Sequence, residues 1–135
     1  MDCVFCKIVA GEIPSEKVWE DSEYLAILDQ FPVCDGQTLV ISKVHKPSYV
    51  FGLSDNEVKD VYLAAKKVAL KLDQALGSPR CIQAMEGIGV NHLHIKLYPL
   101  GESLKEGGVV RIGQRADSVK LKVIADQIRE GGRGD

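Results

Sequence analysis

The alternation of apolar and polar positions predicts β-strands in the first third of the chain. Residues 17–20 and 24–29 flank a polar turn at 21–23, which is the pattern of a β-hairpin. Residues 37–43 follow Gly36 and are rich in β-branched side chains, which favour strands. This part of the chain therefore predicts three strands.

A long amphipathic helix is predicted between residues 54 and 77. Ser54 and Glu57 have the spacing of a capping box, in which two side chains satisfy backbone donors at a helix N-terminus. Apolar residues then recur every three or four positions as far as Leu76, and Gly77 can end the helix. We expect the apolar stripe to face the core and assign it no chemistry.

The second half of the chain mixes strands with a further helix. Residues 80–85 and 92–98 are predicted strands, and a turn at 86–89 separates them. Residues 118–130 carry apolar side chains at helical spacing and predict a second helix. Strands and helices are thus interleaved with tight antiparallel connections, which indicates the α+β class.

Length and composition restrict the possible functions. The 135 residues are 45% apolar and 27% charged, which is typical of one globular domain. The formal net charge of -2 gives no general basis for binding nucleic acid or an anionic membrane. The apolar runs are too short to span a bilayer, and no signal-peptide pattern follows Met1. We therefore expect a cytoplasmic protein, with neither nucleic acid nor a membrane among its partners.

The strand at 92–98 carries the most distinctive polar pattern. Side chains on a strand alternate between its faces, and the apolar residues between the polar ones are expected in the core. Two of the chain's three histidines lie in this row. The polar row on one face consists of His92, His94, Lys96 and Tyr98. A pair of histidines that is merely solvated or satisfied within the core is the alternative interpretation.

A close pair of cysteines at the N-terminus indicates a metal site. Cys3 and Cys6 have the two-residue spacing that lets both thiolates reach one tetrahedral zinc ion. His45 and His92 can complete a closed Cys2His2 site, which would be structural rather than catalytic. A thioredoxin-like redox pair is a second interpretation, although the expected βαβ context is missing. Unpaired buried thiols are a third.

Several segments together resemble the histidine triad (HIT) proteins, in the zinc-bearing form found in bacteria. They occur in the family's order and cover roughly residues 3 to 100. The matching segments are residues 3–15, 18–21, 25–29, 36–45 and 92–94, followed by Pro99. Each is weakly specific alone, but the set is highly specific for the fold.

The resemblance implies a fold, a partner and an assembly. The fold is a five-stranded antiparallel sheet with one long central helix and short terminal helices. We expect a single domain over residues 1–135, with a core at about 3–110 and a C-terminal extension at 111–135 that ends in a flexible tail at 130–135. The implied partners are a purine nucleotide or nucleotide conjugate and a second copy of the chain, as a homodimer.

The same resemblance assigns site residues. His94 corresponds to the nucleophile, and a neutral imidazole can attack phosphorus to give a nucleotidyl intermediate. Asp29 corresponds to the acidic residue that hydrogen-bonds the ribose hydroxyls. The ligands of a structural Zn2+ correspond to Cys3, Cys6, His45 and His92. The apolar slot around the base corresponds to Val4, Phe5, Ile8 and Ile27.

The chain departs from the family pattern at two important positions. Lys96 stands where the third histidine of the triad is usual, and Gln37 stands where a histidine usually follows the glycine of its strand. We place Gln37 in the nucleotide site as a hydrogen-bond donor, and Lys96 in the catalytic site as a cation for phosphate oxygens. The phosphate-binding asparagine and serine of the family have no clear counterparts near Met85 and Gly89.

These residues predict a nucleotide phosphate hydrolase. It would release AMP or GMP from a phosphoramidate or phosphoanhydride through a His94 nucleotidyl intermediate. One alternative is a nucleotidyltransferase or phosphorylase in which Lys96 holds an acceptor phosphate. Another is a purine-nucleotide-binding protein with little catalytic activity.

Overall fold

The computed structural model describes residues 3–100 and 113–131. Contacts divide the chain into two compact units, residues 1–105 and 106–135. Residues 132–135 of the predicted flexible tail lie outside the described part of the chain, as does the predicted end of the core near residue 110.

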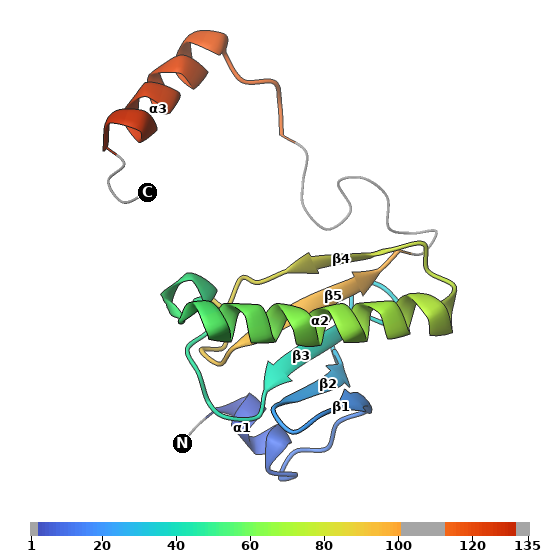
Figure 1. Ribbon diagram of the computed structural model, residues 1–135. Coiled ribbons are helices and arrows are strands. Elements are labelled where there is room, and N and C mark those ends of the chain that lie inside the picture. Colours follow the sequence, from blue (N-terminus) through green and yellow to red (C-terminus); the bar gives the residue numbers. More distant parts are fainter. Residues whose placement is uncertain (1–2, 101–112, 132–135) are drawn as a thin grey trace. The chain divides into compact units, whose positions relative to one another are not determined.

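The first unit is built on one antiparallel sheet (Figure 1). Its strands are β1 (Lys17–Glu20), β2 (Tyr24–Leu28), β3 (Thr38–Ser42), β4 (Cys81–Ala84) and β5 (His94–Pro99). They lie in the order β1-β2-β3-β5-β4, and every neighbouring pair is antiparallel. The predicted α+β class and the five-stranded antiparallel sheet are therefore confirmed.

The central strands fix which residues share a face. In the pairing of β3 with β5, Ile41 lies opposite His94 and Leu39 lies opposite Lys96. Directly opposed residues point to the same face of a sheet. The two polar side chains of β5 therefore share their face with two apolar side chains of β3.

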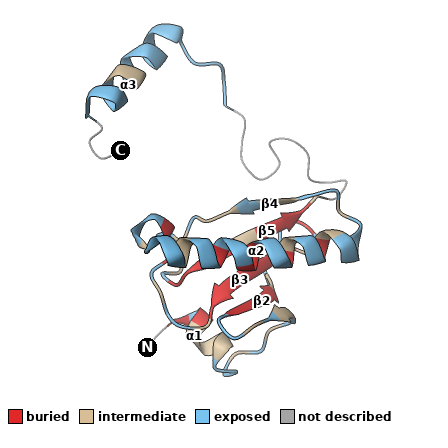
Figure 2. Ribbon diagram, viewed as in Figure 1, coloured by how far each residue is buried: buried red, intermediate tan, exposed pale blue. Residues whose placement is uncertain are grey.

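The long helix α2 (Asp55–Leu76) covers the other face of the sheet. Ser54 and Glu57 form the predicted capping box, and Gly77 ends the helix in the left-handed conformation, with φ of 67°. In Figure 2 the outward side of α2 is exposed, whereas much of the sheet behind it is buried. The core between helix and sheet includes Ala26, Val40, Val61, Val68, Leu93, Ile95 and Leu97.

The short helix α1 (Val4–Val9) packs on the opposite face of the sheet from α2. Its Phe5 is buried in a second apolar cluster. The other buried members of that cluster are Cys3, Leu25, Ile27, Leu39 and Ile41. Because α1 covers only part of this face, the remainder can form the wall of a site.

Two local features differ from the sequence prediction. The strand predicted at 92–98 begins only at His94. The backbone N–H of His92 donates to the carbonyl of Val90, and that of Leu93 donates to the carbonyl of Lys46, which lies beyond the end of β3. A single 3-10 turn, η1 (Val50–Gly52), precedes α2 and was not predicted.

The second unit contains α3 (Ser118–Gly131), which confirms the predicted C-terminal helix to within one residue. Its larger apolar side chains, Leu121 and Ile128 among them, are exposed. Within the residues that the structure describes, no helix is both long and apolar enough to cross a membrane.

Candidate active site and metal cluster

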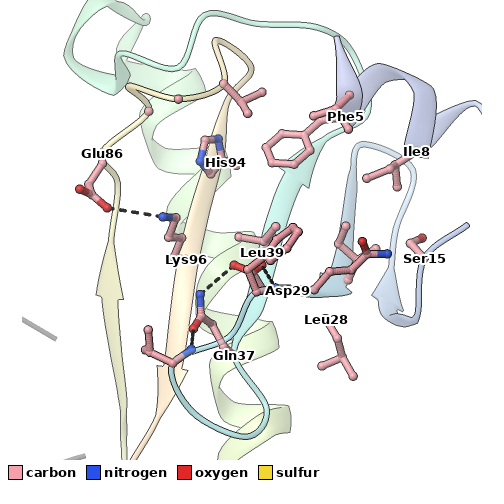
Figure 3. A pocket seen from close by; sticks show the side chains of 18 of the residues that line it. Phe5, Ile8, Ser15, Leu28, Asp29, Gln37, Leu39, Glu86, His94 and Lys96 are labelled. Atoms are coloured by element: carbon pink, nitrogen blue, oxygen red, sulfur yellow. Dashed lines mark hydrogen bonds and ion pairs between the residues drawn. The ribbon is translucent and has the colours of Figure 1, made fainter. Parts of the chain in front are cut away.

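A pocket of about 600 Å³ opens on the face of the sheet that carries α1 (Figure 3). Its walls come from α1, the end of β2, the start of β3, the loop at 86–90 and β5. The residues that the sequence assigned to catalysis or nucleotide binding all line it. These are Val4, Phe5, Ile8, Ile27, Asp29, Gln37, His94 and Lys96.

His94 has one ring nitrogen fixed by the backbone. Its Nδ1 lies 2.6 Å from the carbonyl oxygen of His92. A carbonyl can only accept, so Nδ1 carries the proton and Nε2 keeps a lone pair. Burial lowers the pKa of His94, and the Lys96 cation acts in the same direction, so the imidazole is neutral at neutral pH.

The Phe5 ring makes T-shaped contacts with two histidine rings. Its ring centroid lies 4.9 Å from that of His94 and 5.8 Å from that of His92, and both contacts are T-shaped. Figure 3 shows Phe5 beside the His94 imidazole. Helix α1 therefore contributes a wall of the pocket and also restrains the orientation of the imidazole.

Lys96 is paired with an acidic residue of the loop before β5. Its Nζ lies 3.4 Å from Oε1 of Glu86, and both residues line the pocket (Figure 3). The Lys96 side chain is 28% exposed and that of Glu86 is 64% exposed, so the pair lies at the pocket opening. Lys96 and His94 are two residues apart on β5, which places the cation beside the imidazole.

Asp29 and Gln37 are joined by their side chains. Gln37 donates from Nε2 to Oδ2 of Asp29 at 2.8 Å and accepts from the backbone N–H of Val33 at 2.7 Å. The other carboxylate oxygen of Asp29 accepts from the N–H of Phe31 at 2.9 Å. Asp29 therefore stands at the pocket wall in a fixed orientation.

Sequence reasoning missed part of the lining. Glu86 was assigned only to a turn, and nothing in that turn indicates a partner ten residues away. Phe31 and Ile88 line the pocket although their side chains are 87% and 89% exposed. No sequence signal distinguishes these two from other exposed large apolar residues of the chain, such as Phe51. Tyr98, which was predicted on the polar face of the strand, also lines the pocket, and burial raises its pKa.

The predicted metal ligands form a cluster outside this pocket. The ligand atoms of Cys3, Cys6, His45 and His92 all lie within 4.8 Å of one another, and the four could hold a metal ion. Nδ1 of His92 lies 3.3 Å from Sγ of Cys3, 3.4 Å from Sγ of Cys6 and 3.2 Å from Nδ1 of His45. The cluster joins the start of α1 to the segments that follow β3 and precede β5.

The ring of His92 is oriented so that one nitrogen faces the other members of the metal cluster. Its Nε2 lies 2.7 Å from the carbonyl oxygen of Ser42, so Nε2 carries the proton. Nδ1 then presents its lone pair to the two sulfurs and to His45. A backbone carbonyl is one of the partners that the second nitrogen of a metal-binding histidine commonly has.

Comparisons with known proteins agree with this geometry. The sequence profile of the HIT domain matches residues 10–101. A HIT-like protein of Mycoplasma pneumoniae is 42% identical over 108 residues, which are 76% of this chain and 74% of that protein. An adenosine 5'-monophosphoramidase of Schizosaccharomyces pombe is 36% identical over 105 residues, 73% of this chain and 74% of that protein.

A solved structure shows the same fold. The crystal structure of a HIT family member from Bacillus subtilis superposes with a TM-score of 0.76 and 28% identity, and the alignment covers 100% of both chains. The family profile spans more than half of this chain, and its match ends two residues after β5. The sequence and the fold together show that the chain belongs to the HIT family.

Proposed function

We propose that the protein is a nucleotide hydrolase that releases a nucleoside monophosphate through a covalent intermediate on His94. The observation that carries this proposal is the hydrogen bond from Nδ1 of His94 to the carbonyl of His92, at 2.6 Å. It leaves Nε2 as the nucleophilic atom of a neutral imidazole in the pocket wall. The phosphoramidase activity named for the yeast relative supports the same reaction class.

The reaction has two displacement steps. In the first, the Nε2 lone pair attacks the α-phosphorus, a P–N bond forms, and the bond to the leaving group breaks with its electron pair. In the second, water attacks the same phosphorus and the P–N bond breaks. The lone pair returns to Nε2. One proton of the water stays on the new hydroxyl of the released monophosphate, and the other passes to solvent. The carbonyl of His92 stabilises the ring while it carries positive charge.

Lys96 bears on the choice of leaving group. A lysine cation two residues from the nucleophile can neutralise a non-bridging phosphate oxygen as charge develops. It is a poor proton donor at neutral pH, so an amine that must be protonated gains little from it. We therefore propose phosphoanhydrides as better substrates than phosphoramidates. The same cation could hold an acceptor phosphate, which is the observation that favours nucleotidyl transfer as a second candidate.

The remaining pocket residues suit a purine nucleoside. The side chains of Val4, Phe5, Ile8 and Ile27 offer an apolar slot for the base. Asp29 offers a carboxylate to hydroxyl donors. Most of the nucleotide would thus be held by neutral or acceptor groups, with Lys96 as the cation near the phosphate.

We propose Zn2+ as the ion of the metal cluster. Tetrahedral bonds of about 2.0–2.3 Å place neighbouring ligand atoms roughly 3.3–3.8 Å apart. The contacts of 3.2–3.4 Å around Nδ1 of His92 lie close to the short end of this range, and two thiolates with two imidazoles are a donor set that zinc takes. With four protein ligands, the ion would stabilise the fold and take no part in the reaction.

We also propose a homodimer. Strand β4 is an edge strand within the described sheet, and such edges are open to pairing. On the outward side of α2, Leu63 is 56% exposed and Leu70 is 59% exposed. Light scattering is expected to give twice the chain mass of 14.8 kDa, and a mass of one chain would contradict this.

A panel of substrates tests the proposed reaction. The release of AMP is measured from an adenosine phosphoramidate, a diadenosine polyphosphate, ADP and a nucleotide sugar, with and without added inorganic phosphate. We expect turnover in the wild type and none in His94→Ala, and a phosphorus-labelled substrate should leave label on the wild type after acid-free quenching. Faster turnover that depends on added phosphate would indicate a phosphorylase.

Other outcomes would contradict hydrolysis. Undiminished turnover in His94→Ala would exclude this residue as the nucleophile. Measurable AMP binding without turnover of any substrate would indicate a nucleotide-binding protein. Lys120→Gln, an exposed lysine of α3, serves as a surface control and should behave as the wild type does.

A further inference from the structure

The side chain of Gln37 is a buried link between Asp29 and the loop that follows β2. Gln37 is only 4% exposed, although it borders the pocket. Its amide nitrogen donates to Oδ2 of Asp29, and its amide oxygen accepts from the N–H of Val33 (Figure 3). Both ends of the amide are therefore engaged within the protein.

The chemistry of these partners fixes the orientation of the amide. A carboxylate can only accept a hydrogen bond, and a backbone N–H can only donate one. The amide must therefore direct Nε2 to Asp29 and Oε1 to Val33. Neither a carboxylic side chain in its ionised form nor an apolar one can make both bonds.

Asp29 is held at three points by this arrangement. Gln37 bonds to Oδ2, the N–H of Phe31 donates to Oδ1, and the backbone N–H of Asp29 donates to the carbonyl of Gln37 at 2.9 Å. Each carboxylate oxygen has two lone pairs, so each can still accept one further hydrogen bond. Asp29 thus presents a fixed pair of acceptors at the pocket wall.

The charge of Asp29 restricts what can lie next to it. A phosphate group would be repelled by the carboxylate, whereas a neutral hydrogen-bond donor of the nucleotide would be attracted to its two oxygens. Two adjacent hydroxyl groups, as on a ribose, match two acceptor oxygens of one carboxylate. The match requires that the carboxylate not rotate, because rotation moves both oxygens away from the diol.

We propose that Gln37 is a positioning residue that makes the site selective for nucleotides with an intact ribose diol, by holding the carboxylate of Asp29 in place. This inference rests on the proposed binding of a purine nucleotide in the pocket. The hydrogen bond between Gln37 and Asp29 exists before a ligand binds. Binding therefore does not have to order the Asp29 side chain, which would reduce the affinity.

Calorimetric binding of AMP, 2'-deoxy-AMP and 3'-deoxy-AMP to the metal-loaded protein tests the proposal. A hydrogen bond to a charged group corresponds to a factor of about ten or more in affinity, so the wild type should favour AMP by at least about tenfold over either deoxy ligand. In Gln37→Met the ratio should fall towards one, with the affinity for the deoxy ligands changed least. Gln37→Glu keeps the shape but repels Asp29, and it should lose the ratio in the same way.

A double mutant separates positioning from general damage. If Gln37 acts through Asp29, then adding Gln37→Met to Asp29→Ala should leave the ratio of AMP to deoxy affinity unchanged. The proposal would be overturned if both Gln37 variants kept the wild-type ratio of affinities. It would also be overturned if the wild type bound AMP and the deoxy ligands equally. In either case the proposed binding of nucleotides would be unaffected. A wild type that binds none of the three would overturn the proposed function and the role of Gln37 with it.

Discussion

The carbonyl oxygen of His92 lies 2.6 Å from Nδ1 of His94, while the ring of His92 belongs to the metal cluster. One short segment thus contributes a candidate metal ligand through its side chain and fixes the candidate nucleophile through its backbone. Phe5 touches both rings from α1, the helix that begins between Cys3 and Cys6. A change in the metal cluster is therefore expected to reach the pocket.

Removal of the metal should destabilise the protein. Binding of a structural metal contributes to the free energy of folding, so a strong chelator should lower the melting temperature measured by calorimetry. Cys6→Ser should lower the zinc content measured by mass spectrometry from about one ion per chain. Cys81→Ser is the matched control because Cys81 lies outside the cluster, and it should keep its zinc. Equal melting temperatures with and without chelator would be inconsistent with a structural ion.

Phe5→Leu should slow turnover without removing zinc. Leucine keeps apolar contact with the sheet but loses the edge-to-face packing on His94, which contributes about 1 kcal/mol for an aromatic pair. The His94 ring then gains freedom, and kcat should fall several-fold. Steady-state kinetics and metal analysis on the same sample check this. A full loss of zinc in Phe5→Leu would mean that the residue acts through the cluster instead.

Lys96→Gln should reduce turnover more for a diadenosine polyphosphate than for an adenosine phosphoramidate. In the proposed reaction the lost cation would lie near the phosphate chain of the first substrate, whereas the second has no leaving-group phosphate for it to hold. The ratio of kcat/KM values for the two substrates is the measurement, and Lys120→Gln on α3 is the matched control. Unchanged turnover with both substrates would remove the basis for a role of Lys96.

Glu86→Gln should improve the use of polyphosphate substrates while leaving stability almost unchanged. The carboxylate is 64% exposed, and a pair of this kind contributes at most about 1 kcal/mol to folding. Without this carboxylate, nothing at position 86 competes with substrate phosphates for the Lys96 cation, and the pocket loses a negative charge. The KM should therefore fall. A higher KM would show that Glu86 assists binding.

Gly87→Ala should destabilise the loop that leads to β5. Gly87 has φ of 67°, and an added Cβ would lie 2.6 Å from Cβ and Oγ of Ser48. A left-handed conformation costs about 1–2 kcal/mol for a residue with a side chain, and the clash adds to that. Gly89→Ala is the control, because a Cβ there meets nothing within 4 Å. Denaturant unfolding should separate the two variants by more than about 1 kcal/mol.

Local patterns were sufficient to predict most of the elements. The capping box at Ser54, the apolar period of α2 and the stop at Gly77 each depend on neighbours within a few residues, and all three occur as predicted. Alternation along 92–98 placed His94 and Lys96 on one face, and both line the pocket. The start of that strand was wrong by two residues, because a hydrogen bond from Leu93 to the distant Lys46 decides it.

The sequence by itself determined the strands, the two long helices and, through resemblance, the set of residues worth testing. Only the tertiary structure decided that Glu86 pairs with Lys96 and that the amide of Gln37 donates a hydrogen bond to Asp29. Helix and strand periods follow from backbone geometry, which is local and repeats along the chain. Contacts between a loop and a strand depend on the register of the sheet and on the path of each turn, and these are decided when distant segments pack together.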